Sequence, residues 1–245
     1  MDNYTNEKRA LILAAGLGTR LAPITNDRPK ALVPVNGQPI LLKQIDNLHK
    51  NGIYNITIVA GYKADILKKL VHEKFPEIKI IESIDYATTN NMYSAYLVKE
   101  IVGKHEFLMM NGDVFFDSSI VTSLINCEAK NAIAVDMGKY MEESMKVVEY
   151  DNHIVQISKK ITPKEALGVS IDIYKFSVEG GNSFFAKCSE YIEQRKELNL
   201  WSEVALNDIL NSIEFKACPF HGRWVEIDNH DDLAEAERLF KEDIV

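Results

Sequence analysis

The stretch RALILAAGLGTRL, residues 9–21, decides the fold class of this chain. Residues 9–14 form a short apolar run with the length and composition of a buried strand. Gly16 and Gly18 follow directly, and glycines in such a loop let backbone N–H groups approach the oxygens of a bound anion. The stretch therefore predicts a strand that ends in an anion-binding loop.

The loop differs from two common phosphate-binding motifs. The chain has no G-x-x-x-x-G-K-[ST] sequence, and Leu21 stands where a dinucleotide fingerprint has its third glycine. Arg20 and Lys30 lie close by and can donate charge-assisted hydrogen bonds to phosphate oxygens. From the glycines alone, a tight turn between a strand and a helix explains the pattern equally well.

Further apolar runs alternate with segments of helical periodicity along the first half of the chain. Strands are predicted over residues 55–60, 78–81 and 106–110, in addition to the first one. Helices are predicted over residues 40–50, 64–74 and 91–101. Such alternation predicts an α/β fold, namely a Rossmann-like, mostly parallel mixed sheet with helices on both faces. Ligands of such sheets bind beyond the carboxyl ends of the strands.

The second half of the chain has a different pattern. Strands are predicted over residues 146–150 and 154–158, joined through Asp151-Asn152, and over residues 167–176. These strands predict a small β-rich lobe on the substrate side. Helices are then predicted over residues 183–197, over residues 202–211 and after Asn229, which is a good N-cap.

Composition excludes several classes of protein. The 245 residues have a formal net charge of −8 and no long run of Lys or Arg, so polymeric nucleic acid is not an expected partner. The first apolar run is shorter than the ~18 residues that a membrane span needs, so we expect a cytoplasmic protein without membrane association. Cys127, Cys188 and Cys218 lack metal or disulfide spacing and are expected to be reduced structural thiols.

Longer motifs give a resemblance to a known family. Residues 14–25, AAGLGTRLAPIT, and residues 29–40, PKALVPVNGQPI, resemble the signature of the nucleoside-triphosphate-dependent nucleotidyltransferases. The resemblance continues through residues 59–62, 90–94, 111–113 and 224–228, and so spans almost the whole chain. Asn90-Asn91 and the short length resemble the phosphocholine cytidylyltransferase group, with its aminoethylphosphonate, glycerol-phosphate and inositol-phosphate relatives. Sugar-nucleotide enzymes usually have a glycine-rich segment there.

The resemblance implies an activity and separate parts of the chain for binding the nucleotide and the acceptor. The expected reaction is magnesium-dependent transfer of CMP from CTP to a small phosphorylated acceptor (phosphocholine-like, phosphonate or polyol phosphate) with release of pyrophosphate, in the biosynthesis of cell-surface precursors. The chain is expected to be a single domain over residues 1–245, with nucleotide bound by residues 1–130 and acceptor by the dependent part 131–245. The sequence is compatible with a monomer or a homo-oligomer. The alternatives are a sugar-1-phosphate uridylyl-, thymidylyl- or guanylyltransferase and an inactive nucleotide-binding regulatory domain.

The resemblance also assigns residues to the nucleotide and the metal. Arg20 and Lys30 are the expected catalytic residues, because they would neutralise the triphosphate. Asp113 and Asp228 follow strand ends and are the expected ligands of Mg²⁺, although Asp228 can alternatively cap the last helix. The expected nucleotide contacts are Leu13, Ala14, Ala15, Gly16, Gly18, Thr19, Arg20, Asn90, Asn91 and Ser94. Asn91 can equally be a helix cap.

Four residues of the second half are candidates for the acceptor pocket: Lys146, Lys159, Trp201 and Glu203. Lys159 stands where sugar-nucleotide relatives have a lysine that touches the acceptor phosphate, and Lys146 can assist it. Trp201 and Glu203 suit a cationic head group through cation–π and ion-pair attraction. The alternatives are solvated surface lysines and a tryptophan that only anchors the core.

Overall fold

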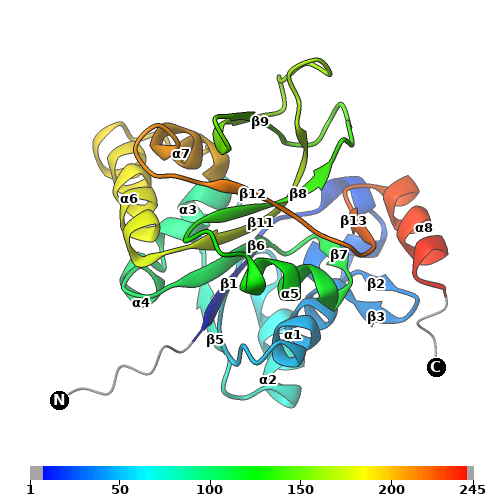
Figure 1. Ribbon diagram of the computed structural model, residues 1–245. Coiled ribbons are helices and arrows are strands. Elements are labelled where there is room, and N and C mark those ends of the chain that lie inside the picture. The colour runs from blue at the N-terminus through cyan, green and yellow to red at the C-terminus, as the bar shows by residue number, and fades with distance from the viewer. Residues whose placement is uncertain (1–7, 242–245) are drawn as a thin grey trace.

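A sheet of nine strands forms the centre of the computed structural model, which describes residues 8–241 (Figure 1). The strand order is β10-β9-β11-β6-β1-β4-β5, and β8 pairs with β11 and β12. The bounds are β1 Arg9–Ala14, β4 Asn55–Ala60, β5 Lys79–Glu82, β6 Phe107–Asn111, β8 Ala132–Met137, β9 Lys146–Tyr150, β10 His153–Ser158, β11 Gly168–Phe176 and β12 Lys216–Pro219. Strands β6, β1, β4 and β5 are mutually parallel, whereas β11 runs antiparallel to β6, β8 and β9.

Helices cover both faces of this sheet. They are α1 Ile40–Lys50, α2 Ala64–Lys74, α3 Asn91–Tyr96, α4 Lys99–Val102, α5 Ser118–Asn126, α6 Val178–Ser189, α7 Ser202–Ile209 and α8 His230–Leu239, with a π-helical turn over Glu190–Gln194. Alternate residues of β1 enter different cores: Ile12 packs with α1, α2 and α5, and Leu13 packs with α3, α6 and α7. The predicted Rossmann-like α/β fold is therefore confirmed.

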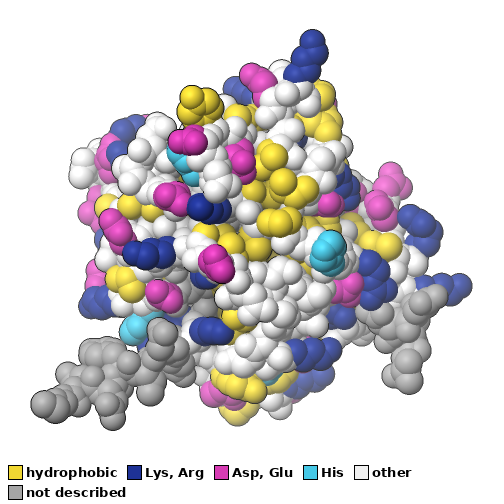
Figure 2. Space-filling view, in the orientation of Figure 1, with side chains coloured by type: hydrophobic (Ala, Val, Ile, Leu, Met, Phe, Trp, Pro, Cys, Tyr) yellow, Lys and Arg dark blue, Asp and Glu magenta, His cyan; other side chains and the backbone are white. Residues whose placement is uncertain are grey.

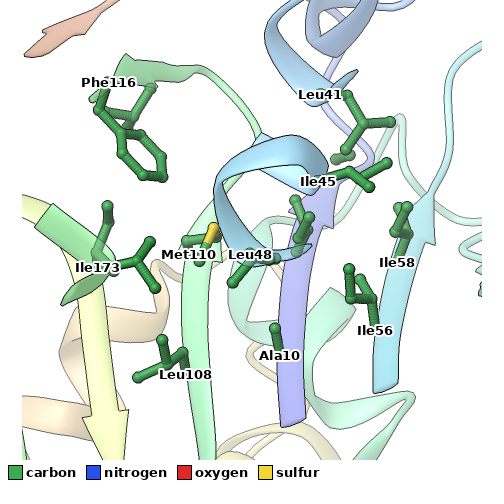
Figure 3. Close-up of a cluster of buried hydrophobic side chains, with 14 of the residues drawn as sticks. Ala10, Leu41, Ile45, Leu48, Ile56, Ile58, Leu108, Met110, Phe116 and Ile173 are labelled. Atoms are coloured by element: carbon green, nitrogen blue, oxygen red, sulfur yellow. The ribbon is translucent and has the colours of Figure 1, made fainter. Parts of the chain in front are cut away.

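The packing of α1 on the sheet shows how an amphipathic pattern selects one face. Leu41, Ile45 and Leu48 point from α1 towards β1, β4, β6 and β11 (Figure 3). All three side chains are fully buried. The helix ends at Asn51, and Gly52 has a φ of 74°, the left-handed conformation expected of a residue that follows a helix.

A third, smaller core attaches the C-terminal helix next to the glycine loop. Strands β7 Val114–Phe116 and β13 Trp224–Glu226 pair antiparallel beneath α8 (Figure 1). Leu21, Ile227 and Phe240 belong to the same buried cluster, so the loop after β1 and the segment after β13 have a fixed relative position. The capping box of Asn229 confirms that residue as the N-cap of α8. Strands β2 Pro34–Val35 and β3 Gln38–Pro39 form a small hairpin.

Element boundaries differ from the predicted ones at several places. The helix predicted over residues 91–101 is two short helices, α3 and α4. The helix predicted from residue 183 begins at Val178, because Ser177 caps it by accepting a hydrogen bond from the Gly180 N–H. Helix α5 and strands β8 and β12 were not predicted. The hairpin through Asp151-Asn152 is confirmed, and both residues have positive φ.

Charged groups of both signs are interspersed on the face shown in Figure 2. Among residues 8–241, none of the helices combines the length with the apolar composition that a membrane span needs.

Candidate active site

A cavity of about 280 Å³ opens at the carboxyl ends of β1 and β6. Its position matches the rule that ligands of open α/β sheets bind beyond the ends of the strands. The predicted site residues that line it are Leu13, Ala14, Ala15, Gly16, Arg20, Lys30, Asn90, Asn91, Ser94, Asp113, Lys159, Trp201, Glu203 and Asp228. Residues from both halves of the chain therefore meet in one cavity.

The two loop glycines have different positions. Gly16 is exposed at the cavity, with open space where a Cβ would be, so its backbone is accessible to a ligand. Gly18 has a φ of 65°, and a Cβ there would lie 2.8 Å from the Cβ of Lys30. Gly18 and Thr19, two of the expected nucleotide contacts, are not among the cavity-lining residues. Gly18 instead allows the loop to close against Lys30.

Lys30 bridges the two predicted metal ligands. Its Nζ donates to Asp113 Oδ2 at 2.7 Å and to Asp228 Oδ1 at 2.6 Å. The Lys30 side chain is only 12% exposed, whereas that of Arg20 is 65% exposed. Arg20 forms an ion pair with Asp228 Oδ2 at 2.8 Å. Asp228 therefore pairs with two cations and does not cap α8, since Asn229 does so.

The charges in this corner shift the pKa values of its members. Burial lowers the pKa of Lys30, but Asp113 and Asp228 raise it by a larger amount, so the net shift is upwards. Burial raises the pKa of Asp228, but Lys30 and Arg20 lower it below its usual value. The pKa of Glu226 is raised to about 7, first by burial and then by the charges of Asp113 and Asp228.

Asp113, Glu226 and Asp228 form what we call the carboxylate triad. Each can offer an oxygen, and these oxygens all lie within 4.8 Å of one another. Asp113 Oδ1 is buried and has no hydrogen-bond partner within residues 8–241, so it has a lone pair available for a cation. Carboxylate oxygens are the ligands that Mg²⁺ and Mn²⁺ prefer. The triad thus fits a hard divalent cation.

Glu226 was missed as a site residue, although the sequence contained a signal for it. It precedes Asp228 by two residues, and side chains two apart in an extended segment point to the same side. Strand β13, Trp224–Glu226, ends at Glu226, and an oxygen of Asp228 lies within 4.8 Å of an oxygen of Glu226.

A second group of carboxyls, Asp172 and Glu203, lies buried at the cavity wall, and we call it the acid pair. The hydroxyl oxygen of Tyr174 lies 2.9 Å from Asp172 Oδ1 and 2.9 Å from Glu203 Oε1. A phenol has one hydrogen and can donate it to only one carboxyl. The second contact is a hydrogen bond only if the other carboxyl is protonated.

The environment of the acid pair favours that proton. Burial raises the pKa of both carboxyls, and the negative charge of Glu203 raises the pKa of Asp172 further. Their other hydrogen-bond partners are neutral: Asn111 donates to Asp172, and the Ser202 hydroxyl donates to Glu203. The acid pair therefore differs from the carboxylate triad, which contacts two cations.

Backbone geometry places Asp172 in the cavity. Asp172 has a φ of 57°, and the register of β11 with β8 shifts between Ser170 and Tyr174. A bulge of this kind re-aims a side chain out of the regular alternation. Asp172, Asn111 and Tyr86 all line the cavity and were not predicted as site residues.

The predicted acceptor residues separate into three that line the cavity and one that does not. The Trp201 side chain is 47% exposed, and Lys159 Nζ lies 5.0 Å from the centre of its ring. Trp201 is therefore not a core anchor. Lys146 is fully buried, and its Nζ donates to the carbonyls of Met141 and Glu142, away from the cavity. The structure does not bring Lys146 into the acceptor pocket.

Asn91 was considered both as a nucleotide contact and as a helix cap, and the cap of α3 is Asn90. Asn90 is the N-cap of α3 and accepts a hydrogen bond from the Asn91 N–H. The Asn91 amide nitrogen lies 3.3 Å from Asn111 Oδ1, and Asn91 Oδ1 accepts from the Ser202 N–H at 2.7 Å. Asn91 thereby connects the ends of α3, β6 and α7 at the cavity.

Comparisons with known proteins give a family and related structures. Residues 9–243 match the family described as nucleotidyl transferase. The chain is 30% identical over 234 residues to the bifunctional protein GlmU of Methanococcus aeolicus, covering 93% of this chain and 53% of that protein. It therefore spans about half the length of this relative. It is 27% identical over 246 residues to the CTP:phosphoglutamine cytidylyltransferase of Campylobacter jejuni, covering 91% of this chain and 97% of that one.

A solved structure is similar over the whole fold. The CTP:phosphocholine cytidylyltransferase of Streptococcus pneumoniae superposes with a TM-score of 0.83 at 25% identity, covering 96% of this chain and 99% of that chain.

Proposed function

The chain belongs to the nucleotidyl transferase family, and on this premise we propose that it transfers CMP from CTP to a small phosphorylated acceptor with a cationic head group. The observation that supports the acceptor class is the acid pair next to an exposed tryptophan ring in the same cavity as the glycine loop. CTP as the nucleotide is supported by two similar cytidylyltransferases, whose names include CTP.

Five residues of the first half would hold the nucleotide. The open backbone at Gly16 and the cations of Arg20 and Lys30 suit the triphosphate, because N–H groups and positive charges stabilise phosphate oxygens. Asn90 and Ser94 line the cavity and can hydrogen-bond a base or ribose. Glu226 and Asp228 come from the second half, so the two parts would share one site rather than divide it.

The reaction needs positioning and charge neutralisation. A phosphate oxygen of the acceptor attacks the α-phosphorus of CTP, the bond from that phosphorus to the bridging oxygen of the β-phosphate breaks, and pyrophosphate leaves with the electron pair. Because a phosphate monoester has its second pKa near ~6, the attacking oxygen is already ionised at neutral pH. No side chain has to act as a general base.

The residues of this chain would have distinct roles in that reaction step. The carboxylate triad would hold a divalent cation, which supplies neutralisation of triphosphate and pyrophosphate charge when bound. Lys30 and Arg20 would donate to the phosphate oxygens of the leaving group, whose charge increases in the transition state. Lys159 would take the acceptor phosphate and leave the Trp201 ring face available to the head group.

A sugar-1-phosphate acceptor is the second candidate, because GlmU is among the similar proteins. A neutral sugar ring would offer no positive charge to the acid pair or to the Trp201 ring, whereas a cationic head group would. A regulatory domain without activity would need no assembled set of Lys30, Asp113 and Asp228.

Pyrophosphate release tests all three candidates. The protein is incubated with each of the four nucleoside triphosphates, Mg²⁺ and three phospho-acceptors: phosphocholine, glycerol 3-phosphate and glucose 1-phosphate. We expect release with CTP and phosphocholine. Preference for a sugar phosphate with another nucleotide would replace the proposal with the second candidate. No release with any pair, alongside nucleotide binding in the same samples, would favour the regulatory domain. The Lys30→Ala variant is the inactive control.

A further inference from the structure

The Lys30 ammonium lies between two members of the carboxylate triad. It lies 2.7 Å from Asp113 Oδ2 and 2.6 Å from Asp228 Oδ1, and its side chain is 12% exposed. The oxygens that the triad can offer to a cation lie within 4.8 Å of one another. An ammonium at hydrogen-bond distance from two of the three carboxylates therefore lies where a shared metal ion would lie.

The charges of this corner explain why the lysine lies there. The three carboxylates together would have a charge of about −3 when ionised, and like charges at this separation repel one another strongly when they are partly buried. Lys30 and Arg20 offset two of these charges. Arg20 is mostly exposed, and within residues 8–241 its one carboxylate partner is Asp228, so Lys30 is the cation that joins two members of the triad.

A divalent cation and Lys30 compete for the same oxygens. Mg²⁺ binds oxygens at about 2.1 Å, so it cannot share Asp113 Oδ2 and Asp228 Oδ1 with an ammonium that lies between them. The buried Asp113 Oδ1 has no partner and is the oxygen through which a cation can first contact the triad. Binding then requires the ammonium to leave, and a buried ammonium needs another anion. A triphosphate held at Gly16 would supply one.

We infer that Lys30 holds the place of the metal in the free protein and is transferred to the nucleotide phosphates when the metal binds. The inference rests on the metal site of the proposed function. It has a thermodynamic consequence: Lys30 weakens metal binding to the free protein, and nucleotide removes this penalty, so metal and nucleotide each increase the affinity for the other.

Metal binding to the nucleotide-free protein tests the inference directly. Free Mn²⁺ is measured by electron paramagnetic resonance during titration of the wild type and of Lys30→Met, which has a side chain of similar length without charge. We expect Lys30→Met to bind Mn²⁺ about ten-fold more tightly or better, because the competing cation is gone. Equal or weaker binding, or no binding by either protein, overturns the inference.

A matched control separates the position of Lys30 from its charge. Lys99 also forms an ion pair, with Glu193 at 2.7 Å, but it lies outside the cavity. Lys99→Met changes the net charge by the same amount and should leave Mn²⁺ affinity within about two-fold of the wild type, because exposed charges at a distance are screened. A ten-fold increase in Lys99→Met as well would make the effect one of net charge and overturn the inference.

Thermal melting gives a second readout that needs no catalysis. In EDTA, Lys30→Met should melt below the wild type, because the triad then lacks its buried counter-ion, and Mn²⁺ should raise its melting temperature more than that of the wild type. If Lys30→Met does not fold, Lys30→Gln is used in both experiments. An equal Mn²⁺-induced rise in variant and wild type overturns the inference. CMP transfer by a wild type that fails these tests would leave the proposed function standing.

Discussion

Lys30 lies between Asp113 and Asp228 at one end of the cavity, whereas Asp172 and Glu203 at the other end face the neutral hydroxyl of Tyr174. At the first end, the nearby cations lower the pKa of Asp228 by more than burial raises it. At the second end, burial raises the pKa of both carboxyls. One cavity thus contains a carboxylate corner with a resident cation and a buried carboxyl pair whose surroundings favour the protonated form. Under the proposed function, the two ends would bind different cations: a metal ion in place of Lys30 at the first, and a cationic head group at the second.

Removal of the resident cation should have the largest effect on turnover. We expect Lys30→Ala to reduce kcat by ~10²-fold or more, because it removes a phosphate contact that strengthens in the transition state. Steady-state pyrophosphate release measures the effect. Lys99→Ala is the control and should retain wild-type kcat. Near-normal kcat in a folded Lys30→Ala would exclude this residue from the chemistry.

Neutralisation of the carboxylate triad should affect metal dependence. Asp113→Asn and Asp228→Asn should each raise the Mg²⁺ concentration for half-maximal activity by about ten-fold or more, since an amide supplies no charge to the cation. Mg²⁺ titrations of activity at saturating CTP measure this. If both variants keep the wild-type Mg²⁺ dependence, the metal is bound elsewhere.

The Trp201 ring should matter only at the acceptor end. Loss of a cation–π contact forfeits ~0.5 to 2 kcal/mol, so Trp201→Ala should raise the KM for the acceptor several-fold to about 30-fold with the KM for CTP nearly unchanged. Because the side chain is 47% exposed, the melting temperature should change little. The two KM values are measured together with a thermal melt. An unchanged acceptor KM in a stable variant would contradict the cationic head group.

The fold and most of the residues at one end of the cavity could be predicted from the sequence. The motifs around Gly16 and Lys30 and the aspartates at strand ends are local patterns, and the cavity brings them together. Asp172 and Tyr174 could not be predicted, because their positions depend on a bulge in β11 and on its pairing with β6 and β8, which are contacts between distant segments.

Side-chain direction explains the remaining difference. Lys146 and Lys159 both belong to the β9–β10 hairpin region, and nothing in the local sequence distinguishes a lysine that turns into a loop from one that faces the cavity. Lys146 donates to the carbonyls of Met141 and Glu142, and Lys159 lies over the Trp201 ring. The Lys146 partners lie in the loop just before β9, whereas Trp201 is distant in sequence, so the position of Lys159 depends on tertiary structure.

The smallest expected effect is on the pH dependence of stability, and it distinguishes the two ends by sign. A carboxyl whose pKa is raised by folding stabilises the protein below its unfolded pKa near ~4, and this contribution is lost as the pH rises through the folded value. Glu203 belongs to this class, whereas Asp228, with a lowered pKa, contributes stability that is lost as the pH falls.

Urea unfolding in EDTA from about pH 3 to pH 8 should therefore separate two variants. Glu203→Gln should lessen the decline of the unfolding free energy towards neutral pH, because the amide has no proton to lose. Asp228→Asn should lessen the decline towards acid pH instead. Glu226, whose pKa is raised to about 7, contributes a decline towards neutral pH in the wild type and in Glu203→Gln and cancels in that comparison, whereas Asp228→Asn also removes a charge that raises the Glu226 pKa. Glu100→Gln, at an exposed surface residue, controls for net charge. A Glu203→Gln profile parallel to that of the wild type would mean that the acid pair is ionised in the free protein, and the contrast between the two ends would then disappear.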